Sequence, residues 1–543
     1  MIGKQTRVPP SPFRMVPVML VLLLSLTGFA HAQFRNEGTI NATTREALEG
    51  TLSVRRMAQP ADAAPDPLYE FYARRDFRPA WSGNRRAEEA GALALAVLAE
   101  SDSQGLRPAD YDATSTRWNS VPEAGVAAAA YDLSLTEDLL RYARDVRLGR
   151  VDPSRVYADV ALPLRQFDAG TALNQALADG TLDIFLAGLP PPHREYRDLV
   201  AALARYRKLD AEGGWPLLPA KGGARQDLLM LRLALEDESL AAAPNEEELF
   251  RAVMRFQTRN GLGADGRIGA ATLAALNVPV RGRIDQIIAN LERWRWLPRQ
   301  FESRTVRVNV PDQMVEYYRN NTSLLSSRVA VGKLTSKTPI VRMMGLSLVA
   351  NPSWEVPGDI AQASILPRLR QNPRYLAENN MVLVNGPPGD PQGLSIDWRK
   401  LKTLPYDIDQ NPGEKSAMGN LMLDSPNDFG VYLHDTPGKE VFEPAARQKS
   451  NGCIRVQDMS ALAALIMADG EFAETGALDQ AVARGVTERL RLGKPVPVYL
   501  LYWTAVADSE GNVGFRSDFY GRDKPLLAAL SAGRRNAKPA ADF

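Results

Sequence analysis

The sequence predicts a multidomain α+β protein with a helical N-terminal half and a mainly-β C-terminal half. The chain has 543 residues, which is more than one core of about 100–200 residues normally holds. Apolar residues recur every three or four positions up to about residue 280, and every second position from Arg304 onward. Hydrophobic residues make up 45% and charged residues 24%, which excludes a wholly disordered chain, a collagen and a coiled coil.

Residues 1–32 have the form of a secretory signal peptide. Three basic residues precede the apolar run Met15–Ala30, and residues 1–32 contain no acidic residue. The run ends in the small-x-small pattern Ala30-His31-Ala32. We therefore expect export, cleavage before Gln33, and no transmembrane helix in the mature chain. An uncleaved anchor is the alternative, although a spanning helix needs ~20 apolar residues and this run is shorter.

The next two segments differ in composition. Residues 33–66 end in a stretch rich in Pro, Ala and Asp and are predicted to be a linker. Residues 67–240 are predicted to form a helical scaffold domain, because apolar residues fall at helical spacing in Leu133–Leu148 and Tyr196–Leu209. No catalytic constellation occurs there, and we interpret His193 as structural.

Residues 245–280 are predicted to be a compact three-helix module. Glu246–Asn260 has Leu249, Val253 and Phe256 on one helix face, and a turn signal at Asp265-Gly266 precedes a second helix. Since only about 35 residues are involved, the hydrophobic core of this module must be small.

Residues 303–505 are predicted to form a mainly-β domain. Residues 355–415 interrupt it with a Pro-, Gly- and Asn-rich insertion, a long loop with one helical piece at Ile360–Leu369, and residues 524–543 are predicted to be a flexible tail. The expected strands alternate in polarity and are Thr305–Val310, Ser327–Val331, Gly345–Ala350, Asp428–His434 and Pro497–Thr504.

Several function classes are excluded by composition and by missing motifs. Lys and Arg number 65 and Asp and Glu 64, a balance that does not favour a nucleic-acid partner. Cys453 is the one cysteine, so no disulfide forms within the chain, and too few Cys and His remain for a structural zinc site. No His-Glu-x-x-His, phosphate-binding loop, Gly-x-Ser-x-Gly or Ser-x-x-Lys motif occurs. We therefore expect neither a metal nor another cofactor.

One histidine and the cysteine lie close in sequence and could form a dyad. His434 follows Tyr432 in a predicted strand, so both side chains should lie on one face, toward a cleft. Cys453 comes nineteen residues later, directly after Gly452. A free thiol is a weak nucleophile at neutral pH, and an adjacent imidazole can take its proton. The competing interpretation is a small buried cysteine and a structural histidine.

The residues around this pair resemble a known active site. His434-Asp435-Thr436-Pro437 followed by Ser450-Asn451-Gly452-Cys453-Ile454-Arg455 is similar to the motif of L,D-transpeptidases, which have a YkuD-type catalytic domain. Upstream stretches resemble the large periplasmic, YcbB-like branch of that family, namely Val331-Gly332-Lys333, Thr338-Pro339, Asn351-Pro352, Trp354, Val356-Pro357 and Pro412-Gly413. Residues that depart from the branch pattern are Ser353, Ser416-Ala417-Met418-Gly419 and Asn451, and they leave substrate details open.

The resemblance extends to the preceding domains. Residues 245–277 are similar to a peptidoglycan-binding module, through Ala252-Val253, Phe256-Gln257, Gly261-Leu262, Asp265-Gly266, Gly269 and Thr272-Leu273. The helical segment resembles the scaffold domain of the same branch, through Phe71-Tyr72, Pro79-Ala80-Trp81 and Gly105-Leu106. The family likeness therefore implies a periplasmic enzyme of peptidoglycan synthesis and cell-wall organisation, covering roughly residues 68–505.

The resemblance also implies a reaction and roles for residues. Cys453 would form a thioester with a tetrapeptide stem, releasing D-alanine, and a second stem would then give a 3→3 cross-link, with His434 as the proton carrier. The remaining candidate residues are Gly452, Asn451, Arg455 and Asp435 for oxyanion or loop support, and Tyr432, Trp354 and Ser450 for the substrate cleft. A backbone carbonyl or Asp435 would orient His434, and Arg455 could equally be held in a structural ion pair.

Other outcomes of the same chemistry remain open. Water as acceptor would make an L,D-carboxypeptidase or endopeptidase, and a protein amine would make an enzyme that attaches lipoproteins. A non-catalytic peptidoglycan-binding scaffold is the alternative outside enzymes. The expected partners are peptidoglycan stems and glycan, a carbapenem as covalent inhibitor, and further cell-wall enzymes.

Overall fold

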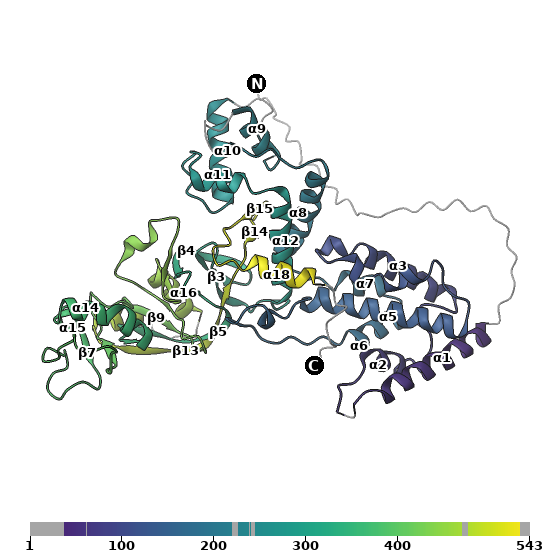
Figure 1. The fold of residues 1–543 in the computed structure, drawn as a ribbon, viewed down its shortest axis with the longest axis horizontal. Coiled ribbons are helices and arrows are strands. Elements are labelled where there is room, and N and C mark those ends of the chain that lie inside the picture. Colours follow the sequence, from purple (N-terminus) through teal and green to yellow (C-terminus); the bar gives the residue numbers. More distant parts are fainter. Residues whose placement is uncertain are drawn as a thin grey trace, which may run out of the picture.

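The computed structural model describes residues 37–60, 62–219, 226–237, 239–240, 245–469 and 476–532. Figure 1 shows a helical domain at one end, a β domain at the other and a small helical module above their junction. The predicted signal peptide lies outside the described residues. Among the described helices, none is long and apolar enough to cross a membrane.

The N-terminal helical domain is built around one long helix, α5 (Gly125–Leu148). Its Leu135 and Leu139 are buried in one core with Leu48 and Leu52 of α1 (Glu37–Met57). The other helices of this domain are α2 (Pro67–Ala73), α3 (Arg85–Ala99), α4 (Ala113–Arg117), α6 (Ala169–Asp179) and α7 (Leu182–Ala187), with 3-10 turns at η1 (Ser101–Gln104), η2 (Pro108–Asp110) and η3 (Pro153–Arg155).

Helix α1 (Glu37–Met57) corrects the prediction of a linker at residues 33–66. Leu48 and Leu52 are four residues apart and therefore lie on the same helix face, where both are fully buried. That apolar pair packs the segment onto the domain, and the linker prediction is wrong for residues 37–57.

A second packing unit joins the domains. Helix α8 (Arg194–Ala211) lies against α12 (Val280–Arg295), and both share a core with the hairpin of β14 (Ala505–Ala507) and β15 (Val513–Phe515). His193 precedes α8, and its Nε2 lies 2.8 Å from the carbonyl oxygen of Pro298. His193 therefore has the structural surroundings that the sequence predicts.

Three helices are described in the small module, and one of them precedes the predicted boundary at residue 245. Helices α10 (Glu246–Arg259) and α11 (Ala270–Leu276) share a core with α9 (Gln226–Ala234) through Leu229 and Phe256. Asn245 caps α10 in a reciprocal pair of hydrogen bonds with Glu248, which fixes where that helix begins.

The β domain is a sheet that closes on itself. Its order is β5-β13-β2-β3-β4-β12-β10-β9, and β9 pairs again with β5. The bounds are β2 (Arg304–Asn309), β3 (Met314–Arg319), β4 (Thr322–Gly332), β5 (Ile340–Ala350), β9 (Leu421–Asp424), β10 (Leu433–His434), β11 (Gln448–Ser450), β12 (Ile454–Val456) and β13 (Glu488–Leu501). Alternate residues such as Val306, Val308, Val329 and Leu433 fill the interior.

Short elements complete this domain. They are η5 (Lys439–Phe442), α16 (Met459–Ala468) and α17 (Ala477–Ala483). Strand β11 pairs with β4, and β1 (Val160–Ala161), which comes from the helical half of the chain, pairs in parallel with β5. The predicted strand Asp428–His434 is shortened to β10, because Asn427 accepts from the backbone N–H of Phe429 and Val431 and bends the chain before it.

The insertion at residues 355–415 is more than a loop. Its elements are β6 (Trp354–Val356), α13 (Gly358–Ile360), a π-helical turn η4 (Ala361–Ile365), α14 (Leu366–Gln371), α15 (Tyr375–Glu378), β7 (Met381–Leu383) and β8 (Ile408–Gln410). The three strands form their own sheet, and Trp398 and Leu369 are buried in a separate core. The helical piece predicted at Ile360–Leu369 is present.

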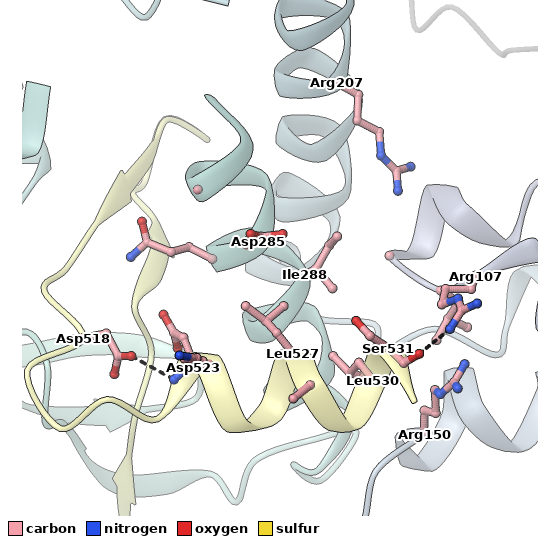
Figure 2. A pocket seen from close by; sticks show the side chains of 16 residues that line it. Arg107, Arg150, Arg207, Asp285, Ile288, Asp518, Asp523, Leu527, Leu530 and Ser531 are labelled. Carbon is pink, nitrogen blue, oxygen red and sulfur yellow. Dashed lines mark hydrogen bonds between the residues drawn. The ribbon is translucent and has the colours of Figure 1, made fainter. Parts of the chain in front are cut away.

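Helix α18 (Asp523–Ser531) corrects the prediction of a flexible tail at 524–543. Its Leu526 and Leu530 are buried in the core of the β domain, while residues 533–543 lie outside the described residues. A cavity of about 650 Å³ lies beside α18. Figure 2 shows Arg107 and Arg150 at the C-terminal end of this helix. Arg107 donates to the carbonyl of Ser531 and Arg150 to that of Ala532, as cations favour a helix C-terminus.

The first turn of α18 contains a buried ion pair whose loss should destabilise the fold. Arg293 Nη1 lies 2.6 Å from Asp523 Oδ1, and the Thr504 hydroxyl donates to the other carboxylate oxygen at 2.8 Å. Asp523→Ala leaves a buried guanidinium unpaired, and we expect a loss of about 3–5 kcal/mol in the free energy of unfolding.

Urea denaturation of the two proteins measures this difference. The control is Arg85→Ala, which breaks a pair with Glu89 whose side chains are 93% and 64% exposed, and it should leave the free energy of unfolding nearly unchanged. A cost for Asp523→Ala as small as that of the control would contradict the role assigned to the buried pair.

Candidate active site

The sheet brings Cys453 and His434 onto neighbouring strands. Strand β10 pairs in parallel with β12, with His434 opposite Arg455, and the N–H of Ile454 donates to the Tyr432 carbonyl at 2.8 Å. Cys453 directly precedes β12, so it is diagonal to His434 on the same face, with a Cα separation of roughly 8 Å. That separation is within reach of an imidazole and a thiol.

The two side chains are not hydrogen-bonded to each other. The Cys453 Sγ lies 3.8 Å from the Gly430 carbonyl, and among the described residues the buried Nδ1 of His434 has no hydrogen-bond partner. Catalytic hydrogen bonds are often open in free enzymes and close when substrate binds. The geometry is therefore that of a dyad in an open arrangement.

The backbone before Cys453 has a conformation that requires glycine. Gly452 has φ +121°, while an added Cβ would meet its nearest neighbour at an ordinary 3.5 Å. The constraint is thus backbone conformation and not space. Ser450, which is buried, donates from Oγ to the Cys453 carbonyl at 2.6 Å and accepts from the Gly452 N–H at 3.2 Å. Ser450 therefore shapes the turn and does not line a cleft.

Thr338 ties this turn to the sheet. Its hydroxyl donates to the Gly452 carbonyl at 2.8 Å and accepts from the Gly332 N–H at 2.9 Å. Tyr520 holds the same place from outside the predicted domain: its hydroxyl donates to the Gly332 carbonyl at 2.5 Å and accepts from the Thr338 N–H at 3.1 Å. Arg522 adds a bond to the Thr338 carbonyl at 3.2 Å.

Sequence reasoning did not assign these supporting residues. Thr338 belongs to a stretch that resembles the family, but its partner Gly452 lies 114 positions away. Tyr520 falls after the predicted domain end at residue 505. The Thr-Pro pair was the one available signal.

Burial makes His434 a neutral imidazole. The side chain is 4% exposed, although the sequence predicts a position facing a cleft. Desolvation and, after it, the nearby Arg455 cation lower the pKa of His434 to about 4, against hydrogen bonds with the backbone of Asp435 and Met418 that act in the opposite direction. Met418 lies in the loop that covers the imidazole, and the sequence did not identify it as a site residue.

The thiol is also neutral at rest. Burial raises the pKa of Cys453, and the Tyr432 backbone, the Arg455 cation and the N–H of Cys453 itself partly offset this effect. The pKa of Arg455 is lowered by burial and raised by Cys453 and Glu440, and its buried Nε has no hydrogen-bond partner among the described residues. Arg455 is therefore a cation close enough to affect the thiol, with a buried Nε that no described residue bonds.

The other predicted site residues occupy distinct places. Asp435 accepts from Lys439 Nζ at 2.7 Å and from the Asn420 N–H at 3.2 Å, so its carboxylate holds the covering loop. Asn451 is exposed and accepts from Lys333 Nζ at 3.2 Å. Both residues are bound within loops around the dyad.

Tyr432 and Trp354, the two aromatic residues predicted to line a substrate cleft, have different surroundings. Tyr432 is partly exposed, and burial together with Cys453 and Glu355 raises its pKa, which places it beside the thiol and near the insertion. Trp354 packs against the core of the insertion. Tyr432 thus fits a cleft position better than Trp354 does.

Comparison with protein families divides the chain as the fold does. Residues 66–203 match a scaffold domain, residues 244–276 a putative peptidoglycan-binding domain, and residues 303–498 the YkuD L,D-transpeptidase catalytic domain. A putative L,D-transpeptidase of Haemophilus influenzae is 31% identical over 245 residues, which are 45% of this chain and 49% of that protein. This chain thus matches about half the length of that curated relative.

Solved structures show partial likenesses. An L,D-transpeptidase from Mycobacterium smegmatis is 13% identical over 36% of this chain and 58% of its own, with a TM-score of 0.19. Another from Stackebrandtia nassauensis is 14% identical over 50% of this chain and 88% of its own, with a TM-score of 0.20. On the family matches, the chain carries an L,D-transpeptidase catalytic domain together with a scaffold domain and a peptidoglycan-binding domain.

Proposed function

We propose that this protein is a peptidoglycan L,D-transpeptidase that works outside the cytoplasm through a thioester on Cys453. One observation carries the proposal: a cysteine on a tightly held glycine turn lies diagonal to a buried, neutral histidine on the adjoining strand. The match of residues 303–498 to the L,D-transpeptidase catalytic domain supports it.

In the first half-reaction, His434 takes the proton of Cys453. Its low pKa means that the imidazole is free to accept a proton at neutral pH. The sulfur attacks the carbonyl carbon between the third and fourth residues of a tetrapeptide stem. The C–N bond then breaks, His434 returns the proton to the departing D-alanine amine, and a thioester remains on Cys453.

In the second half-reaction, the side-chain amine on the third residue of another stem attacks the thioester. His434 accepts the amine proton and passes it to the leaving sulfur, which restores the thiol and completes a 3→3 cross-link. The Cys453 N–H is the suitable oxyanion donor, because it already lies near the sulfur whereas the Gly452 N–H is bound to Ser450. Arg455 would stabilise the thiolate or hold a stem carboxylate.

The acceptor decides between the related activities. Water would give an L,D-carboxypeptidase or endopeptidase, and a protein amine would attach a lipoprotein to the wall. The peptidoglycan-binding domain at residues 244–276 favours a stem amine, because it would hold the enzyme on strands that carry many acceptors.

A carbapenem tests for the activated thiol. Wild-type protein should gain one adduct in intact-mass spectra, Cys453→Ala should gain none, and His434→Ala should react about 100-fold more slowly because general-base assistance is lost. Folded protein with a titratable thiol and no adduct would contradict the proposal. Incubation with disaccharide-tetrapeptide then separates dimer formation from hydrolysis.

The pH dependence tests whether the dyad is neutral at rest. Because the pKa of Cys453 is raised and that of His434 is about 4, thiolate accumulates only in alkaline solution. The rate of alkylation by iodoacetamide should therefore be low from pH 5 to 8 and rise above pH 8. A rate plateau across pH 5–8 would instead show a preformed thiolate–imidazolium pair.

Thr338→Val removes the hydroxyl that holds the turn and leaves the side-chain volume nearly unchanged. The Gly452 carbonyl and the Gly332 N–H are then left buried without a partner, so we expect a lower melting temperature and, at a temperature where the variant is still folded, acylation by carbapenem that is about tenfold slower or more. Thr338→Ser keeps the hydroxyl and should retain most of the rate. Equal rates for Thr338→Val and wild type would contradict this role.

A further inference from the structure

A groove of about 1050 Å³ lies where the peptidoglycan-binding domain, α8 and the β domain meet. Residues of α10 form one wall, and residues of β2, β3 and the β14–β15 hairpin form the other. Figure 1 shows α10 above this junction and β3, β14 and β15 below it. The groove is separate from the 450 Å³ pocket that lies within the small module.

Arg307 of β2 is a buried cation that opens into this groove. The residue is 7% exposed, and its guanidinium lies 3.7 Å from the ring centre of Phe301 and 4.0 Å from that of Tyr318. Its Nε donates to Thr305, but Nη2 has no hydrogen-bond partner within the described chain. A buried donor without a partner calls for an explanation, and a bound ligand supplies one.

The other arginines of the groove are already engaged. Each has a carboxylate or a backbone carbonyl within bonding distance: Arg194 with Ser509, Arg251 with Glu247, Arg255 with Asp237, Arg259 with Glu236, and Arg516 with Asp312. Among the described groove arginines, Arg307 is the one without a carboxylate or backbone carbonyl in hydrogen-bond contact, although Glu195 and Glu316 of the same groove lie near enough to act on its charge. Two flat rings hold its guanidinium in place, so it is pre-organised for a planar acceptor such as a carboxylate.

An aromatic platform lies in the same groove. Trp503 is partly exposed and stacks on the buried Trp294, with ring centres 4.5 Å apart and planes at 15°. Asn309 fixes the Trp503 backbone through a pair of hydrogen bonds of 3.1 and 2.8 Å. A rigid, partly exposed indole presents an apolar surface with polar groups around it, which suits the C–H face of a sugar ring.

The groove and the candidate active site share the outer face of the sheet. Arg307 pairs with Glu316, Glu316 with Ser326, and further along β4 Ala330 pairs with Arg455. Paired residues point to the same side, so Arg307 and Arg455 lie on one face, roughly 20 Å apart along its surface. A sugar with its attached stem peptide can bridge a distance of this order.

We propose that this groove is a second binding subsite for an acidic glycopeptide strand of peptidoglycan, with a sugar on Trp503 and a stem carboxylate on Arg307. This inference rests on the proposed function and adds a place for the strand outside the site of acyl transfer. The subsite holds one part of the strand while a neighbouring stem reaches Cys453.

Calorimetry with the full chain tests the subsite. The probes are soluble glycan strands with tetrapeptide stems, the same strands without stems, and the free tetrapeptide. Arg307→Gln should weaken binding of stem-bearing strands about tenfold or more and leave binding of stem-free strands unchanged. Trp503→Leu should weaken binding of both kinds of strand. Arg251→Gln, on the α10 wall of the groove and already paired with Glu247, is the control and should bind as wild type does.

Hydrogen exchange on the wild-type protein covers the case in which a variant does not fold. Stem-bearing strands should protect amides in β3 and in residues 503–512, and the free tetrapeptide should not. The subsite would be overturned if Arg307→Gln and Trp503→Leu bound the strands as tightly as the wild-type protein does. It would also be overturned if strands protected amides only in the small module. Carbapenem acylation of wild-type Cys453 is measured in parallel. If no acylation occurs, the proposed function is wrong. If acylation occurs but the substitutions Arg307→Gln and Trp503→Leu leave strand binding unchanged, only the subsite is wrong.

Discussion

The hydroxyl of Thr338 is the interaction on which the candidate site depends most. It joins the end of β4 to the carbonyl of Gly452, in a place where both partners are buried and water cannot replace it. The positive φ of Gly452 turns the chain so that Cys453 enters β12 opposite the strand that carries His434. Without this tie, the turn would have several conformations, and the relation of thiol to imidazole would be lost.

The same place connects the site to the rest of the molecule. Arg522 bonds to the Thr338 carbonyl and pairs with Asp159 of the helical half at 2.5 Å. Directly after Asp159, β1 of that half pairs in parallel with the first residues of β5. Contacts between domains of one chain are often loose, yet here they are ion pairs, sheet pairing and a helix end held by arginines. The catalytic domain is therefore packed against the helical half through specific contacts and is not only connected to it by the chain.

Local patterns predicted much of this arrangement. The alternation at Thr305–Val310 and Gly345–Ala350 predicts strands because each faces the core on one side only, and the helical piece predicted at Ile360–Leu369 is present in the insertion. The pairing of β10 with β12, which brings His434 near Cys453, agrees with the motif that suggested a dyad.

Features that depend on distant contacts were not predicted. The burial of His434 comes from the loop at Met418, and nothing near His434 in the sequence signals it. Helix α1 depends on the packing of Leu48 and Leu52 against the core around α5, and α18 depends on the packing of Leu526 in the β-domain core. Neither contact can be seen in the local sequence. The partners of Thr338 and the orphan donor of Arg307 likewise exist only once the fold has formed.

Tyr520 gives the site an order of assembly. A ribosome makes the chain from its N-terminus, so the thiol exists before the residue that completes the tie at Gly332 and Thr338. The contact spans more than 180 positions, and such long-range contacts form late in folding. In a nascent or truncated chain that ends before Tyr520, the turn before Cys453 thus lacks part of its hydrogen-bonded support. Competence for acyl transfer would arise only when synthesis has passed Tyr520.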